Sequence, residues 1–273
     1  MHPRSISRST PSASLGIAFG MILPLLLTAS AAMAGNEPAA PAPDREAFLA
    51  GAQKDCPGCD LREAKLKRRD LSGADLTGAD LSGAVLHRAK LASAKLDHAK
   101  LQDANLNKAD LKRASLTGAD LTGALLYGTD LSAAQLEGAI MREVHMRHGR
   151  LTRTVLRNAD ISLSTIVDAE MAGSDLSHAN LKQSNLSSAN LSRCDLTAAV
   201  LDGAGFVRAR LADAKLTNVS ARGADFYGAD LSGADLTDGD FRGSRLQQAD
   251  LDGAVTVGIK TRGALLVDGT VGQ

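Results

Sequence analysis

Two stretches of the chain contain residue types that could do chemistry. The first is CPGC at residues 56–59, two thiols at the spacing of a redox-active or metal-binding motif. The second is residues 140–158, which carry five arginines against Glu143 alone and so have a formal charge of +4. Thiolates attack disulfides and bind metals, whereas arginine binds carboxylates and phosphates. Which chemistry is possible depends on the elements that position these side chains.

An uninterrupted five-residue repeat runs through both stretches. Every fifth residue from Leu61 to Leu251 is apolar, which gives 39 positions without an insertion. A second column, two residues earlier, holds small residues, mostly Ala. Because residues two apart in an extended strand point to the same side, both columns are expected to face inward. The residue between them is expected to point outward, and the next two to turn the chain through a corner.

Repetition of this kind predicts a solenoid, in which each coil stacks on the last at about 4.8 Å. Segments such as DLSGADLTGADL (residues 70–81) and SNLSSANLS (residues 184–192) resemble the pentapeptide-repeat family, whose consensus is A(D/N)LXX. The resemblance covers residues 55–254. It implies an all-β fold, a right-handed quadrilateral parallel β-helix with four repeats per coil and about ten coils.

The remaining residues are expected to form a leader and the two ends of the solenoid. Residues 1–34 have the basic start, apolar run and small-residue cleavage site of a secretory signal peptide, so we expect a periplasmic or secreted protein. The mature chain would have no transmembrane segment and a net charge of about −2. Residues 35–54 are expected to be a linker and an N-terminal cap with a short helix that Asp44 starts. Residues 255–273 would be either a C-terminal cap or, as in relatives that dimerise end to end, a homodimer contact.

Counting by fives places both thiols inside the first coil. Cys56 falls in the Leu column and Cys59 in the small-residue column, so we expect core packing or a local structural disulfide. A redox role would need a helix N-terminus that lowers a thiol pKa, and a zinc site would need further ligands; neither is evident nearby. Cys194 is also in the small-residue column and is expected to be buried. No metal, cofactor or catalytic residue is predicted.

The basic interval is the best candidate for a binding site. Spread around roughly one coil, its side chains would form a belt that binds anionic groups of an acidic protein or of an envelope polymer. We refer to the following residues as the basic belt: Arg142, His145, Arg147, His148, Arg150, Arg153 and Arg157.

The alternative is that Arg150 and Arg157 are already committed to ion pairs between coils and that the rest of the belt is a solvated surface. Asp130 and Glu170 stand four repeats before and after Arg150, and Glu137 stands four repeats before Arg157. In a coil of four repeats these offsets predict ion pairs between neighbouring coils, each worth at most about 1 kcal/mol at an exposed surface.

These features favour a non-enzymatic, exported binding or scaffold protein with an unidentified envelope partner. No catalytic motif is recognisable, and no insertion interrupts the repeat to build a pocket. The alternative is DNA mimicry, because the best-known family members resemble duplex DNA and inhibit or protect type II topoisomerases such as gyrase. The near-neutral charge argues against mimicry and against nucleic-acid binding. So do Lys90, Lys95 and Lys100, which interrupt the acidic columns.

One residue departs from the pattern of the small-residue column. Arg69 is the one long charged side chain at these positions. We expect it to mark either a distorted second coil or an inward salt bridge.

Overall fold

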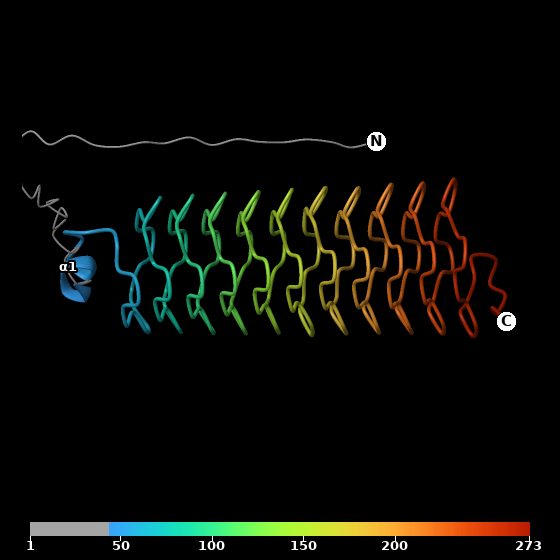
Figure 1. The fold of residues 1–273 in the computed structure, drawn as a ribbon, viewed down its shortest axis with the longest axis horizontal. Helices are drawn as coiled ribbons and strands as arrows, with labels where there is room; N and C mark the ends of the chain where they lie inside the picture. Colours follow the sequence, from blue (N-terminus) through green and yellow to red (C-terminus); the bar gives the residue numbers. More distant parts are fainter. Residues whose placement is uncertain (1–43) are drawn as a thin grey trace, which may run out of the picture. The chain divides into compact units, whose positions relative to one another are not determined.

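The computed structural model describes residues 44–273, so the expected signal peptide and residues 35–43 lie outside the described range. The first element is the short helix α1 (Arg45–Ala50), and the chain after it winds into coils that stack along one axis (Figure 1). The predicted solenoid is therefore confirmed.

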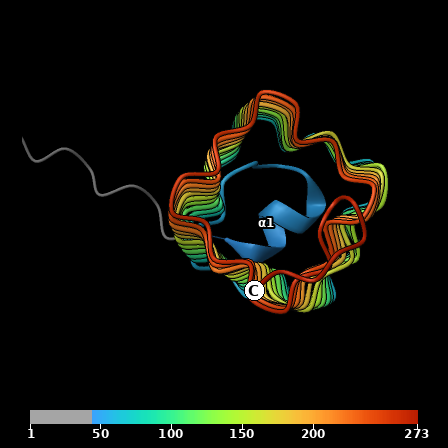
Figure 2. The same cartoon turned by 90° about the vertical axis from the view of Figure 1, so that its right-hand side faces the viewer.

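The coils are joined by isolated parallel bridges at single residues. Asp60 bridges Asp80, and the same offset recurs at every fifth residue up to the pair Arg245 and Leu265. Backbone hydrogen bonds accompany each bridge; Leu61 N donates to Asp80 O at 2.7 Å, for example. A bridge at every fifth residue, always to the residue four repeats later, gives each coil four sides, visible as the four-cornered outline in Figure 2.

Both predicted inward columns are buried in one continuous core. Phe206 and Phe226, one coil apart, stack with ring centroids 4.9 Å apart, as the stacking of equivalent positions requires. Most hydroxyl groups in the small-residue column have acceptors inside this core, and Thr129 Oγ1, for example, donates to Leu106 O at 2.8 Å. Ser244 Oγ is the exception among the described residues, since it is buried without a partner. A column of small residues with internal hydrogen-bond acceptors lets opposite walls lie close while leaving few buried polar atoms unpaired.

The corners are tight turns of two residues. The second residue has a left-handed φ, which glycine adopts without strain, as at Gly73 (φ 70°), but many other residue types also adopt it here. The outward aspartate before a turn often accepts a hydrogen bond from the backbone N–H two residues on, as Asp75 Oδ1 does from Thr77 N at 3.1 Å. We number the corners in chain order: corner 1 holds residues 62–63, corner 2 holds 67–68, corner 3 holds 72–73 and corner 4 holds 77–78, each with its equivalents in the later coils.

Helix α1 packs against the open end of the first coils. Asp44 Oδ1 accepts hydrogen bonds from two N–H groups of the first turn, and Gly51 ends the helix at φ 86°. Phe48 is completely buried and joins the core, and α1 lies within the outline of the coils in Figure 2.

The departure at Arg69 is explained by this helix. Its guanidinium donates to the carbonyl oxygens of Phe48 and Leu49 and lies 4.6 Å above the Phe48 ring. The expected inward salt bridge is therefore wrong, because the free carbonyls at the helix C-terminus accept the hydrogen bonds instead of a carboxylate. The coil itself is regular at this point, with Arg69 N bonded to Leu66 O at 3.1 Å, so the expected distortion is also not seen.

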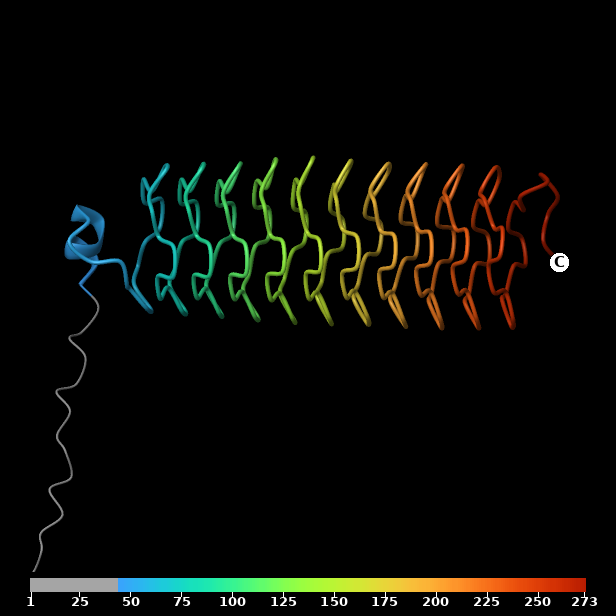
Figure 3. The same ribbon diagram turned by 90° about the horizontal axis from the view of Figure 1, so that it is seen from above.

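The C-terminal end is covered less completely. The chain turns back after the last parallel bridge (Figure 3). Leu265 forms an antiparallel bridge with Val271 there. Val257 remains 68% exposed and Val271 59% exposed, and Ile259 is only half-buried. Within residues 44–273, no helix has the length and apolar character to cross a membrane.

Candidate functional site

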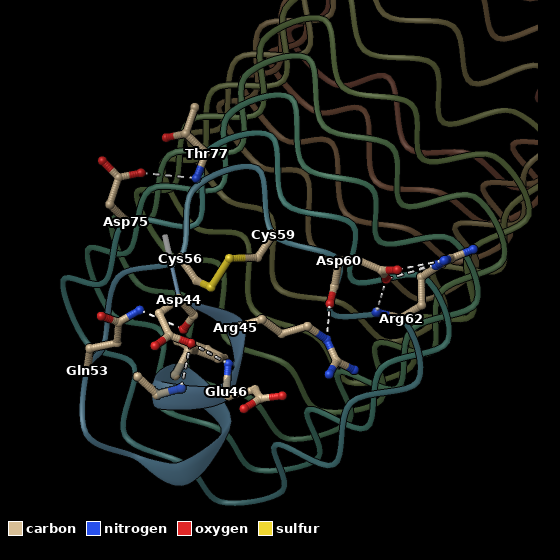
Figure 4. The surroundings of a disulfide bond; sticks show 12 residues. Asp44, Arg45, Glu46, Gln53, Cys56, Cys59, Asp60, Arg62, Asp75 and Thr77 are labelled. Carbon is tan, nitrogen blue, oxygen red and sulfur yellow. Dashed lines mark hydrogen bonds and ion pairs between the residues drawn. A yellow bond between two sulfur atoms is a disulfide. The ribbon is translucent and has the colours of Figure 1, made fainter. Parts of the chain in front are cut away.

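The cysteine pair belongs to the first coil. Cys56 and Cys59 are joined in a disulfide, both are buried, and Figure 4 shows them at the start of the coil beside α1. The third cysteine is free, and burial raises the pKa of the Cys194 thiol to about 12. A thiol protonated to that extent is a poor nucleophile. In the part of the chain that the structure describes, no group of three acidic, histidine or cysteine side chains could hold a metal ion.

The basic belt is exposed throughout, but the structure distributes it around the coil instead of gathering it on one surface. The positions are as follows: Arg142 at corner 1, His145 on the side before corner 2, Arg147 and His148 at corner 2, Arg150 on the side before corner 3, Arg153 at corner 3 and Arg157 at corner 4.

Two belt arginines, at corners 1 and 4, are held by carboxylates of neighbouring coils. Arg142 Nε lies 2.5 Å from Asp160 Oδ2. Arg157 contacts Glu137 at 2.9 Å and Asp175 at 3.3 Å, which confirms the predicted pairing with Glu137. The hydrogen bond with Glu137 raises the pKa of Arg157 further. Both guanidinium groups are therefore already engaged.

At corner 2 the belt residues share one acid. Asp168 lies 3.7 Å from Arg147 Nε and 4.0 Å from His148 Nδ1. The His148 ring also contacts the edge of Tyr127, with ring centroids 5.8 Å apart. This corner therefore combines charge with an exposed aromatic side chain.

The predicted pairing of Arg150 with Asp130 or Glu170 is wrong. Lys112 Nζ lies 3.4 Å from Asp130 Oδ2, and Arg210 lies 3.7 Å from Glu170 Oε1. Both carboxylates thus interact with cations on their far sides. Within residues 44–273, Arg150 forms no ion pair.

Arg153 is also without an ion pair in the described chain, and it borders a groove along corner 3. Gly173 separates Arg153 from Arg193, so the two guanidinium stems stand two coils apart, about 10 Å, with little side chain between them. Arg193 is 3.7 Å from Asp213. The groove has a volume of about 630 Å³ and is lined by Ser132, Ala133, Thr152, Arg153, Ala172, Gly173, Ser192 and Arg193.

This groove was not found from the sequence, because its residues are scattered over four coils. The signal was present at every fourth repeat: Ala133, Arg153, Gly173 and Arg193 alternate small and large at one corner. Comparing residues 20 apart in the sequence, which share a corner, predicts the groove, whereas comparing neighbouring residues does not.

Comparison with known families accounts for the repeat. A model of pentapeptide repeats matches in eight copies between residues 59 and 169, and a pentapeptide repeat region model matches residues 169–255. The chain belongs to the pentapeptide-repeat family. The resemblance inferred from the five-residue columns is thus confirmed.

Solved structures of pentapeptide-repeat proteins are similar to this chain. HetL from the cyanobacterium Nostoc sp., a protein involved in heterocyst differentiation regulation, is 31% identical, with 82% of this chain and 96% of that chain covered and a TM-score of 0.51. QnrB1, a plasmid-mediated fluoroquinolone resistance protein, is 15% identical over 73% of this chain and 87% of that one, with a TM-score of 0.40. A comparison with curated protein sequences gives no match.

Proposed function

We propose that this pentapeptide-repeat protein is an exported, non-enzymatic binding or scaffold module that recognises acidic groups of an envelope partner at the corner 3 groove. About ten rigid coils would hold the groove at a fixed place, with α1 as the N-terminal cap. The complete burial of Phe48 supports this role of the helix.

The observation that carries the proposal is the selective availability of two belt arginines. Arg142 and Arg157 are held by carboxylates, whereas Arg150 and Arg153 have no ion pair in residues 44–273. Arg153 lines the groove at corner 3, and Arg150 lies on the side just before that corner. A guanidinium group presents a planar fork of donors that matches a carboxylate or phosphate in two hydrogen bonds. An acidic partner would therefore gain contacts here without first breaking an ion pair of Arg150 or Arg153.

The groove also offers neutral polar groups beside these cations. Thr152 Oγ1 donates to Ser132 Oγ at 3.1 Å, and both hydroxyls line the groove. Small side chains at Ala172 and Gly173 leave the floor accessible. This surface suits an extended acidic segment better than a small metabolite, because the groove is lined by residues of four coils and is open to solvent instead of enclosed.

Crosslinking in the cell envelope tests the proposal. The mature protein is compared with Arg150→Ser/Arg153→Ser, and with Arg142→Ser/Arg157→Ser as a control that removes the same charge from corners 1 and 4 of the same coils. We expect the first variant to lose the captured partner and the control to retain it. Circular dichroism verifies that both variants keep the solenoid.

Two results would contradict the proposal. Capture of the same partner by the groove variant would show that corner 3 is not the site, and the absence of any partner for the native protein would remove the binding role. Fractionation of cells that produce the full chain tests export separately, because a protein retained in the cytoplasm would contradict the envelope location.

A further inference from the structure

A second positive surface runs along corner 2, parallel to the axis of the coils. Arg68, Arg88 and Lys108 occupy the same corner position in three successive coils, about 4.8 Å apart. Lys65 and Lys67 extend this line in the first of the three coils. We refer to these five residues as the basic ridge. All five side chains are exposed.

Acidic residues are absent from this line. From Lys65 to His148, no aspartate or glutamate occupies corner 2 or the outward position before it in any coil. In the described part of the chain, none of the five ridge residues forms an ion pair. Like charges placed opposite each other on neighbouring strands repel, so the ridge is a destabilising arrangement in the absence of an anion.

The other surfaces of the same coils are arranged differently. Lys90 lies 3.9 Å from Asp70, an aspartate one coil earlier on the same side. Lys95 and Lys100 are each 3.6 Å from an aspartate at the equivalent position. The chain thus pairs its outward lysines with aspartates on three sides of these coils, whereas corner 2 and the outward position before it contain no carboxylate.

The charge at the ridge is dense enough to affect a neighbouring histidine. His87 lies between the ridge residues, and its pKa is lowered by desolvation and then by the positive charges of Arg88, Lys67, Lys108 and Arg68. Four cations therefore act on one half-buried imidazole from three coils.

An apolar hollow follows the ridge on the next coils. Tyr127 is 45% exposed beside Leu125, and the Lys108 ammonium lies 5.6 Å from the centre of the Tyr127 ring. The hollow has a volume of about 310 Å³ and is lined by Asn107, Leu125, Tyr127, His145, Met146, Arg147 and Thr165. It offers an aromatic face together with amide, imidazole and hydroxyl groups around it.

We propose that the basic ridge and this hollow bind a linear anionic polysaccharide that lies along the axis of the coils. Its carboxylate, sulfate or phosphate groups pair with the ridge, and one sugar ring packs on Tyr127 with its hydroxyls near Asn107 and Thr165. The residues differ from those of the corner 3 groove, so either proposal can fail without the other.

The shape of the surface favours a polysaccharide over other anions. Single-stranded nucleic acids are bound by several aromatic side chains on which successive bases stack, whereas corner 2 holds two tyrosines among the described residues, Tyr127 beside the ridge and Tyr227 five coils further on. A planar anionic membrane would also approach Asp70 and Asp110 on the adjacent side. A polymer chain can follow a line of charge that is one residue wide.

Binding of a fluorescein-labelled alginate oligomer, followed by anisotropy at two salt concentrations, tests this proposal. The ridge variant is Lys67→Gln/Arg88→Gln/Lys108→Gln. The control, Lys90→Gln/Lys95→Gln/Lys100→Gln, removes three charges from similar coils at other surfaces. We expect the ridge variant to weaken binding by at least about tenfold and to lessen its salt dependence, while the control changes it less than about twofold.

Further measurements test the contribution of the hollow and the class of polymer that binds. Tyr127→Ala is expected to weaken alginate binding with little change in salt dependence, and Arg150→Ser/Arg153→Ser is expected to leave it unchanged. Equal losses in the ridge and control variants would overturn the proposal, as would no binding by the native protein at millimolar oligomer. Tighter binding of a single-stranded DNA of matched charge, or of phosphatidylglycerol vesicles, would overturn the polysaccharide assignment.

Discussion

At the scale of single residues, the corners contain the least favourable backbone conformations of the solenoid. The second residue of each corner has a left-handed φ, and many residues other than glycine adopt it, among them Leu163 at φ 60°. For an L-residue this conformation is less favourable by roughly 1–2 kcal/mol. The fold therefore tolerates a repeated local strain, offset by the backbone ladder and the continuous core.

Leu163→Gly is expected to stabilise the protein. The side chain is 52% exposed, so the substitution removes little burial and relieves the left-handed strain. We expect the free energy of unfolding to rise by roughly 1 kcal/mol, measured by urea denaturation. Gly138→Ala is the reciprocal control, because its φ is 64° and nothing lies within 4 Å of the added methyl group. It should destabilise by a similar amount; no effect in both variants would contradict the strain argument.

Asp240 predicts a pH dependence of stability. Hydrogen bonds from the Arg242 guanidinium hold the pKa of Asp240 well below its usual range, and Arg222 adds a contact at 2.7 Å. A carboxylate with a lowered folded pKa stabilises the protein above the unfolded value near 4, and this contribution disappears as the pH falls through the folded pKa.

Asp240→Asn should therefore lower the free energy of unfolding by roughly 1–2 kcal/mol at pH 7. The difference in the free energy of unfolding between the variant and the native protein, measured by urea denaturation, should decrease as the pH falls below about 4. Asp252→Asn serves as the control, since Asp252 is exposed and has no ion pair in residues 44–273. A gap for Asp240→Asn that stays constant with pH would contradict this account.

At the scale of elements, the N-terminal end depends on a contact between α1 and Arg69, an inward position of the first coils. Only six residues form the helix, which is too short to be stable alone. Phe48 in the core and Arg69 at the last carbonyls fix its position. The stability of α1 is thus almost entirely tertiary.

Arg69→Ala should release α1 without unfolding the coils beyond it. The change removes two hydrogen bonds from a charged donor and a contact over the Phe48 ring. We expect faster amide exchange and faster proteolysis in residues 44–53, with unchanged protection in the central coils. Arg68→Ala, one residue earlier and without an ion pair in the described chain, should change neither rate. Equal protection of α1 in both variants would show that Arg69 does not hold it.

The sequence predicted the elements better than it predicted their contacts. The five-residue columns predicted which side chains are buried, because in a repeat without insertions the position of every residue within its repeat is unambiguous. The partner of Arg150 could not be predicted, since two acids and several cations at equivalent positions of neighbouring coils compete and rotamers decide among them. The role of Arg69 also depended on an element outside the repeat, whose packing the columns do not describe.

At the scale of the whole described solenoid, the two ends differ. The N-terminal end has α1 and a disulfide, while the C-terminal end leaves Val257 and Val271 largely exposed. Leu246, Leu251, Ile259 and Leu266 line an open apolar hollow there. Exposed apolar surface of this kind favours association.

Self-association through this end stays a prediction. We expect the mature protein to sediment as a concentration-dependent dimer, and Val257→Glu/Ile259→Glu to sediment as a monomer. Leu163→Glu is a control that adds charge at an exposed apolar residue away from the end. A native protein that is monomeric up to about 100 μM, well above the range of stable dimers, would identify the terminal segment as a sufficient cap.

Because every coil has the same length, the position of a residue in the sequence determines the side of the solenoid on which it lies. Each residue's place around the axis is set by its position within a coil of four repeats, as the unbroken series of bridges shows. Removing one repeat would rotate every later column by a quarter turn, so a line of charge along one corner would be cut and continued on the next side. Removing four repeats together would shorten the solenoid by one coil and leave every surface aligned. Length in such a protein can therefore change in whole coils without disturbing a surface that spans them.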